Sequence, residues 1–221
     1  MNGPDILSHT RELLATAVAR HRPSTHHPLN VSPYVAMSLL QKAIRRGEQA
    51  LALRAAATLH LSDPARLWRR LGVIAPEDVG VADLETLFVV TAALAGNTVR
   101  GRLGGEWPVA SYLTWRLARS DKCRAADDLL LAAQRHPSLA HEGREFAFLP
   151  TRELIEITTG SGPLPERALA LGYALGTGRR PSKHLQFRRG EPGLVFDELC
   201  ERGLPHTVVE IARENFRRCF R

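Results

Sequence analysis

Two adjacent carboxylates are the clearest candidates for acid–base chemistry in this chain. Glu77 and Asp78 lie in the run Ala-Pro-Glu-Asp-Val-Gly. Such a pair does acid–base work when its surroundings move the two pKa values apart. The helical pattern before it carries Arg69 and Arg70, however, and structural ion pairs are commoner than shifted catalytic carboxylates. We therefore interpret the pair as ion-paired, or as a cap on the next helix.

Cys123 is the candidate nucleophile. It stands between Lys122 and Arg124 near a helix start, and neighbouring cations lower the pKa of a thiol. A cysteine nucleophile also needs a base, and the sequence assigns no histidine to this role. Since no catalytic signature occurs elsewhere, we expect a protein without enzymatic activity. An enzyme with a site around Glu77, Asp78 or Cys123 is kept as an alternative.

Three histidines near the N-terminus raise the question of a metal. His21, His26 and His27 lie in the run HRPSTHHPLN, which has two prolines and no periodicity. Adjacent histidines in a loop, with no acidic or cysteine partner nearby, do not supply the ligand count of a metal site. We expect a solvated loop here, and no metal or cofactor in the protein.

Aromatic residues and a glycine-rich stretch offer two further ways to contact nucleic acid. Trp68, Trp107 and Trp115 would suit the stacking of bases, but Trp68 and Trp115 fall on apolar helical faces. We interpret them as core residues. The stretch 96–105 carries Arg100 and Arg102 between glycines. Without a defined phosphate signature, we expect it to be a plain connection.

Two segments have basic residues in patterns that suggest phosphate contact. Residues 179–189 hold five cations and one histidine, with no acidic residue before Glu191. Such a segment cannot pair its charges locally, so its counterion is solvent or an anionic partner. A second basic set recurs at i, i+3 and i+4 on one side of a helix expected from residue 33. The candidate phosphate-binding residues are Lys42, Arg45, Arg46, Arg179, Arg180, Lys183, Arg188 and Arg189.

The elements that would position these residues are helices. Ser32-Pro33 and Asp63-Pro64 combine a capping side chain with proline at the first helical position, and Gly47 suits the end of a helix. Alanine and leucine dominate the apolar residues, which favours helices over strands. Leu185 and Phe187 could add a short strand or anchor a loop. We expect helices over 5–20, 33–46, 48–60, 64–75, 83–97, 107–119, 122–135, 152–158, 163–175 (starting at Pro163 or Pro165), 192–202 and 205–220.

The run LQKAIRRGEQALALRAAATL followed by LWRRLGVIAPEDVGVAD resembles the region after the ATPase core in the replication-associated recombination protein A family. These are AAA+ relatives of the clamp loaders. The similarity covers roughly residues 36–131. The matching positions are Lys42, Ile44, Arg45, Arg69, Arg70, Leu71, Ala75, Glu77, Asp78, Gly80 and Ala82, with a weaker continuation over 120–125.

The resemblance implies the helical lid and collar of such a protein, which oligomerises and packs near DNA. The chain departs from the family where nucleotide chemistry would lie. It has no Gly-x-x-x-x-Gly-Lys-Ser/Thr loop, which cradles phosphates. About 35 residues precede the matching region, and one βαβ unit alone takes about 30. We therefore expect no ATPase activity.

Composition bounds the remaining possibilities. The chain has 221 residues, a formal net charge of +7 and a pI near 10.0, which is compatible with nucleic-acid contact without demanding it. The basic excess is spread across both halves. Cys123, Cys200 and Cys219 form no C-x-x-C pair and suggest reduced thiols. With no signal-peptide pattern and no apolar run of about 20 residues, we expect a cytoplasmic protein without membrane contact.

Together these features predict an all-α fold in three parts. Residues 1–30 form a helix and linker, 31–140 a collar-like bundle, and 141–221 a loop-rich helical section packed on it. The expected function is a non-enzymatic module of DNA replication, repair or recombination. It would bind DNA phosphates, and associate with itself or with a replication or repair protein. The alternative is a protein-only scaffold whose arginines meet an acidic partner.

Overall fold

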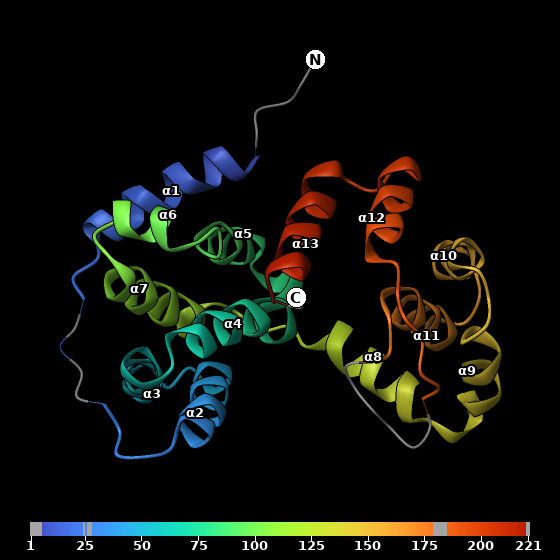
Figure 1. The fold of residues 1–221 in the computed structure, drawn as a ribbon, viewed down its shortest axis with the longest axis horizontal. Helices are drawn as coiled ribbons and strands as arrows, with labels where there is room; N and C mark the ends of the chain where they lie inside the picture. The colour runs from blue at the N-terminus through green and yellow to red at the C-terminus, as the bar shows by residue number, and fades with distance from the viewer. Residues whose placement is uncertain (1–5, 24, 26–27, 179–184, 220–221) are drawn as a thin grey trace. The chain divides into compact units, whose positions relative to one another are not determined.

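The computed structural model describes residues 6–23, 25, 28–178 and 185–219 (Figure 1). All regular structure in these residues is helical, which confirms the all-α prediction. None of the described helices is both long and apolar enough to cross a bilayer. The α-helices are α1 (Ile6–Arg20), α2 (Pro33–Arg46), α3 (Gln49–Ser62), α4 (Pro64–Ile74), α5 (Leu84–Ala93), α6 (Asn97–Arg102), α7 (Glu106–Arg119), α8 (Ala125–Arg135), α9 (Ala140–Phe146), α10 (Thr151–Thr159), α11 (Leu164–Leu175), α12 (Pro192–Glu201) and α13 (His206–Cys219).

Helix ends form where the sequence provides caps. The hydroxyl of Ser32 accepts a hydrogen bond from the Val35 N–H at the start of α2. The carboxylate of Asp63 accepts one from the Arg66 N–H at the start of α4. Gly47 follows α2 with a left-handed φ of 72°, which suits a residue without a side chain. These ends agree with the predicted ones because capping depends on neighbours in sequence.

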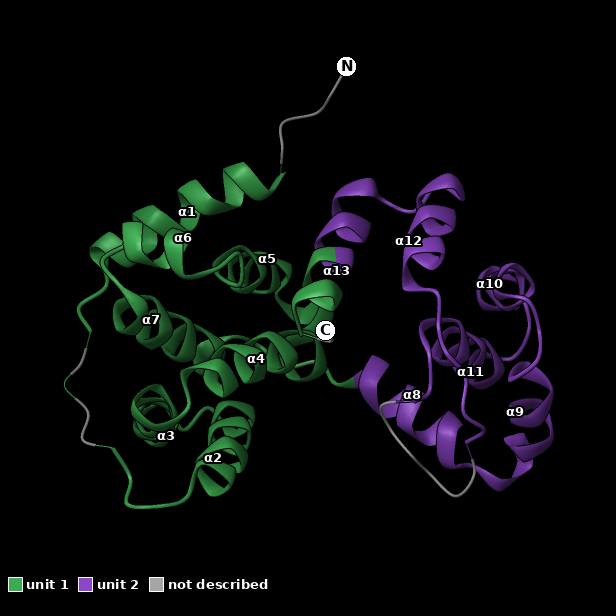
Figure 2. Ribbon diagram, in the orientation of Figure 1, with its two compact units in different colours: residues 1–124, 214–221 green, residues 125–213 purple. Residues whose placement is uncertain are grey.

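The described chain forms two compact units, coloured separately in Figure 2. Unit 1 is residues 1–124 with 214–221, and unit 2 is residues 125–213. The division differs from the predicted boundaries at 30 and 140. Helix α1 belongs to unit 1 because Leu14 and Val18 are buried in the same apolar core as α2 to α5 and α7. Helix α8 belongs to unit 2, and α13 begins in unit 2 and ends in unit 1.

The core of unit 1 includes the end of α13. Asn215 is buried, and its side-chain amide donates to the Gly72 carbonyl and the Thr91 hydroxyl, both at 3.2 Å. Pro76 has no N–H to donate to the carbonyl four residues earlier, which is that of Gly72. Asn215 supplies that carbonyl with a donor. After α4 the backbone continues as a π-helical turn, Ala75–Val79, instead of ending at Pro76 as predicted.

Unit 2 has its own core around α8 to α12, with Tyr173 fully buried. The tyrosine hydroxyl accepts a hydrogen bond from the Gln186 N–H at 3.1 Å. The Thr177 hydroxyl donates to the Gln186 carbonyl at 2.6 Å. These bonds tie residues 185–188 to the end of α11 without forming a strand, so this stretch is an anchored loop. Phe187 within it is 77% exposed.

Candidate nucleic-acid interface

Asp78 is the centre of a buried ion-pair network in unit 1. Its carboxylate is fully buried. It accepts hydrogen bonds from Arg45 Nε at 2.7 Å, Arg124 Nη1 at 2.6 Å and Gln41 Nε2 at 3.0 Å. A buried carboxylate is stable only when it is paired in this way. The ion-pair interpretation of the acidic residues is confirmed for Asp78, with Arg45 and Arg124 as its partners.

Glu77 joins the same network from its edge. Gln41 Nε2 lies 3.3 Å from Glu77 Oε2, and Arg70 Nη1 donates to Gln41 Oε1 at 3.0 Å. Burial lowers the pKa of Arg70, and the charges of Glu77 and Asp78 oppose that shift. The Gln41 amide thus donates to both carboxylates, and the guanidinium groups of Arg45 and Arg124 pair with Asp78. This arrangement favours a structural role for them over acid–base chemistry.

The backbone of Cys123 locks the segment after α7 onto the same turn. Its N–H donates to the carbonyls of Asp78 and Val79, at 3.1 and 3.2 Å. Gly80 has a φ of 56°, and a Cβ there would meet the Cys123 carbonyl oxygen at 2.6 Å. Only glycine fits this approach. The Glu-Asp-Val-Gly run thus has a structural explanation: it pairs two arginines and admits a close backbone contact.

The exposed cations of α2 lie at a corner where α2 and α7 end. A Cβ at Gly47 would lie 3.5 Å from the Ala118 carbonyl oxygen, so the two helix ends touch. Arg46 and Arg119 are the sequence neighbours of these residues, and both are exposed. Lys42 is exposed one turn before Arg46. We call Lys42, Arg46 and Arg119 the corner cations. None of the three has an ion-pair partner among the described residues.

The predicted phosphate-binding residues divide into exposed residues, residues engaged in other contacts, and residues outside the described part of the chain. Lys42 and Arg46 are exposed at the corner, whereas Arg45 is committed to Asp78, with its side chain still 40% exposed. Arg188 is half-buried in unit 2, where it donates to the Ala147 carbonyl and the Thr151 hydroxyl, both at 3.0 Å. Arg189 is exposed. Arg179, Arg180 and Lys183 lie outside the described residues.

Sequence reasoning missed Arg119 because it considered cations one helix at a time. Arg119 is 73 residues from Arg46, and only the packing of α2 against α7 brings their helix ends together. One signal in the sequence indicated that this region matters, the weak continuation of the family pattern over 120–125, directly after Arg119. That segment includes Arg124, which pairs with Asp78.

Formal charge is divided unequally between the units. Unit 1 contains 19 of the 30 Lys and Arg residues and 11 of the 23 Asp and Glu residues, a balance of +8. Unit 2 contains the other 11 basic and 12 acidic residues, a balance of −1. The two halves of the sequence do not reveal this division, because unit 1 also takes residues 111–124 and 214–221 from the second half, and both stretches are basic.

The other candidates from the sequence have structural roles. Arg100 is buried in α6, where its Nε lies 2.8 Å from Glu106 and its guanidinium lies over the Trp68 ring at 4.1 Å. The stretch 96–105 is thus partly helical. Trp68 belongs to the unit 1 core, as predicted. His21 makes a 3.0 Å hydrogen bond to the Ser111 hydroxyl on α7, while His26 and His27 lie outside the described residues.

Comparison with known proteins adds no assignment. No protein-family model, curated protein or solved structure matches this chain. The resemblance to the clamp-loader relatives therefore stays a prediction, and the charges and contacts described above are the basis for proposing a function.

Proposed function

We propose that this chain is a non-enzymatic helical module that binds nucleic-acid phosphates through the corner cations of unit 1. The observation that carries the proposal is that Lys42, Arg46 and Arg119 are exposed, without an ion-pair partner in the described part of the chain, in a unit with a formal balance of +8. Cations without a carboxylate partner attract polyanions, and release of counterions from the polyanion drives such binding. Arg119 also lies over the Trp115 ring at 5.1 Å, which leaves its charge unneutralised.

The Asp78 network supports this proposal by fixing the corner. It joins α2, through Arg45, to the segment after α7, through Arg124. Both helix ends are thereby held while the corner cations stay in solvent. A rigid arrangement of cations loses less conformational entropy when it binds. We place the module in DNA replication, repair or recombination, as the family resemblance implies, with self-association or docking to a partner protein.

The test is fluorescence anisotropy of labelled single-stranded and duplex DNA, with the full chain, between about 50 and 200 mM salt. We expect affinity to fall with salt. The triple variant Lys42→Glu, Arg46→Glu, Arg119→Glu should bind more weakly. Its salt slope should fall by about 3, because each phosphate that the protein no longer neutralises lowers the slope by about one unit.

Two matched variants separate local binding from overall charge. Arg20→Glu, Arg22→Glu, Arg102→Glu changes the charge of unit 1 by the same amount at exposed positions elsewhere. It should keep most of the affinity. Arg179→Glu, Arg180→Glu, Arg189→Glu tests the second predicted basic segment and leaves the anchoring Arg188 in place. Equal decreases in affinity for the corner and control variants would contradict a specific corner interface.

The anisotropy measurement, with light scattering on the same protein, tests the protein-only alternative. In that case no DNA would be retained even at low salt, and light scattering would show a stable oligomer. The arginines would then meet an acidic protein.

A further inference from the structure

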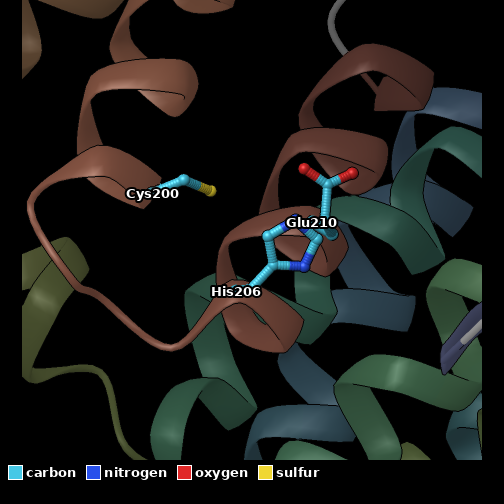
Figure 3. A group of neighbouring side chains, drawn as sticks. All are labelled: Cys200, His206 and Glu210. Carbon is cyan, nitrogen blue, oxygen red and sulfur yellow. The ribbon is translucent and has the colours of Figure 1, made fainter. Parts of the chain in front are cut away.

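Three side chains of types that can ligate a metal ion converge at the turn between α12 and α13 (Figure 3). Cys200 Sγ, a ring nitrogen of His206 and a carboxylate oxygen of Glu210 all lie within 4.8 Å of one another. Cys200 and Glu210 are half-buried and His206 is exposed. All three belong to unit 2, whereas the corner cations belong to unit 1.

Backbone contacts of the turn hold these side chains in place. Gly203 has a φ of 82°, which reverses the chain after α12. Its N–H donates to the Cys200 carbonyl at 3.1 Å, and the Leu204 N–H donates to the Leu199 carbonyl at 3.2 Å. His206 and Glu210 are four residues apart on α13, so they share one face of that helix. The convergence therefore follows from the helical hairpin itself.

The donor set matches the preferences of zinc. Thiolate, imidazole and carboxylate are the three protein ligands of Zn²⁺, at about 2.3 Å for sulfur and about 2.0–2.2 Å for nitrogen and oxygen. Tetrahedral coordination at these lengths places the donors about 3.5 Å apart. Since the donors lie within 4.8 Å of one another, the closure needed is at most about 1.3 Å, which small side-chain rotations provide.

One neighbouring cation competes for the carboxylate. Arg213 Nε lies 3.3 Å from Glu210 Oε1. The same guanidinium also makes a 2.7 Å bond from Nη2 to Asp197. Arg213 therefore keeps a carboxylate partner when Glu210 turns toward an ion, which lowers the cost of rearrangement.

We propose that Cys200, His206 and Glu210 form a binding site for one Zn²⁺ ion. The three residues fill three tetrahedral positions and leave the fourth to water or to a donor from another molecule. An ion there joins the last turn of α12 to the first turns of α13 and fixes the angle between the two helices.

Cobalt substitution tests the site directly. The full chain is stripped with a chelator, kept reduced with a phosphine, and titrated with Co²⁺. We expect one equivalent to bind and to produce a thiolate-to-cobalt charge-transfer band with the visible bands of tetrahedral coordination. Zn²⁺ should then displace cobalt and remove the colour.

Variants assign the ligands and distinguish a site from stray thiol binding. Cys200→Ser should abolish the charge-transfer band, and His206→Ala should weaken affinity more than the about 10- to 100-fold typical of residues behind the ligands. Cys123→Ser is the matched control and should keep the band. Cys219 is buried, and burial raises the pKa of its thiol to about 11, so it does not compete near neutral pH.

Two results would overturn the proposal. One is an absence of any thiolate band in the reduced wild-type chain. The other is failure of the ligand variants to act as expected: the band persists at full intensity in Cys200→Ser, or His206→Ala binds Co²⁺ with unchanged affinity. Circular dichroism of each variant verifies that the helices are intact, and His206 is exposed, so its replacement leaves the fold in place.

Discussion

The buried carboxylate of Asp78 should contribute to the stability of unit 1. Its fully buried carboxylate pairs with Arg45 and Arg124, whose side chains are 40% and 23% exposed. Asp78→Asn keeps the shape but removes the charge. We expect the free energy of unfolding to fall by about 1.5–3 kcal/mol, because hydrogen bonds to charged groups are worth about that much. Urea unfolding followed by circular dichroism measures the shift.

The control for this prediction is Asp121→Asn, an exposed acidic residue near Arg124 in sequence. It should change stability by less than about 0.5 kcal/mol, as most surface substitutions do. If Asp78→Asn were as mild as the control, the network would not stabilise unit 1. A bound substrate or a pH-dependent activity at Asp78 would instead revive the enzyme alternative.

The lowered pKa of Asp83 should make the stability of unit 1 depend on pH. It caps α5 and accepts hydrogen bonds from the Thr86 N–H at 2.9 Å and the Ser120 hydroxyl at 2.9 Å. Burial alone would raise the pKa of Asp83, but these bonds, one from the Thr86 hydroxyl and the charge of Arg116 outweigh it and lower the pKa. The stabilisation is therefore present above the unfolded value, about pH 3.9, and is lost as pH falls through the folded value.

The variant Asp83→Asn isolates this contribution. Asparagine keeps a capping oxygen but carries no charge, so the variant should unfold at lower urea than wild type at pH 7. We expect the gap between the two midpoints to shrink below about pH 4. A gap that stays constant from pH 7 to pH 3 would show that the charge of Asp83 does not contribute.

Among the helices, α4 and α13 can pack closely because Gly72 has no side chain. A Cβ at Gly72 would overlap Cys219 Sγ and lie 2.7 Å from Leu94 Cδ1. Gly72→Ala should destabilise unit 1 by about 1–3 kcal/mol, as overpacking of a core does. It should do so although alanine favours a helix. Cys219→Ala added to this variant should recover part of the stability, measured by urea unfolding.

Gly101 in α6 is the matched control. No atom lies within 4 Å of the Cβ that an alanine would add there. Gly101→Ala should therefore show only the helix preference of alanine, a gain of about 0.5–1 kcal/mol. A similar gain for Gly72→Ala would mean that α4 and α13 pack loosely.

Helix α6 shows why some elements escaped prediction. Its sequence, Asn-Thr-Val-Arg-Gly-Arg, contains a glycine and has little apolar periodicity, so local rules favour a loop. Arg100 stabilises the helix through the Ala93 carbonyl and Glu106, at 3.0 and 2.8 Å. The helices that were predicted well, such as α2 and α4, carry their caps within the same few residues.

At the scale of the whole molecule, the unpredicted features are those that join distant positions. Arg124 meets Asp78 across 46 residues, and Asn215 meets Gly72 across 143. Residue types and spacing do not encode such pairs. The sequence therefore identified Lys42 and Arg46 as exposed cations, but not the partner of Arg45 or the proximity of Arg119. The +8 and −1 balances of the units likewise depend on which stretches of the chain each unit contains.

The return of α13 into unit 1 has a consequence for biosynthesis. Asn215 and Cys219 complete a core whose other helices end by residue 119. The whole of unit 2, residues 125–213, lies in the chain between those helices and Asn215. On the ribosome, unit 2 has all of its residues before unit 1 does. During synthesis the core of unit 1 therefore stays incomplete, and the surface around Gly72 stays uncovered, until the end of α13 emerges.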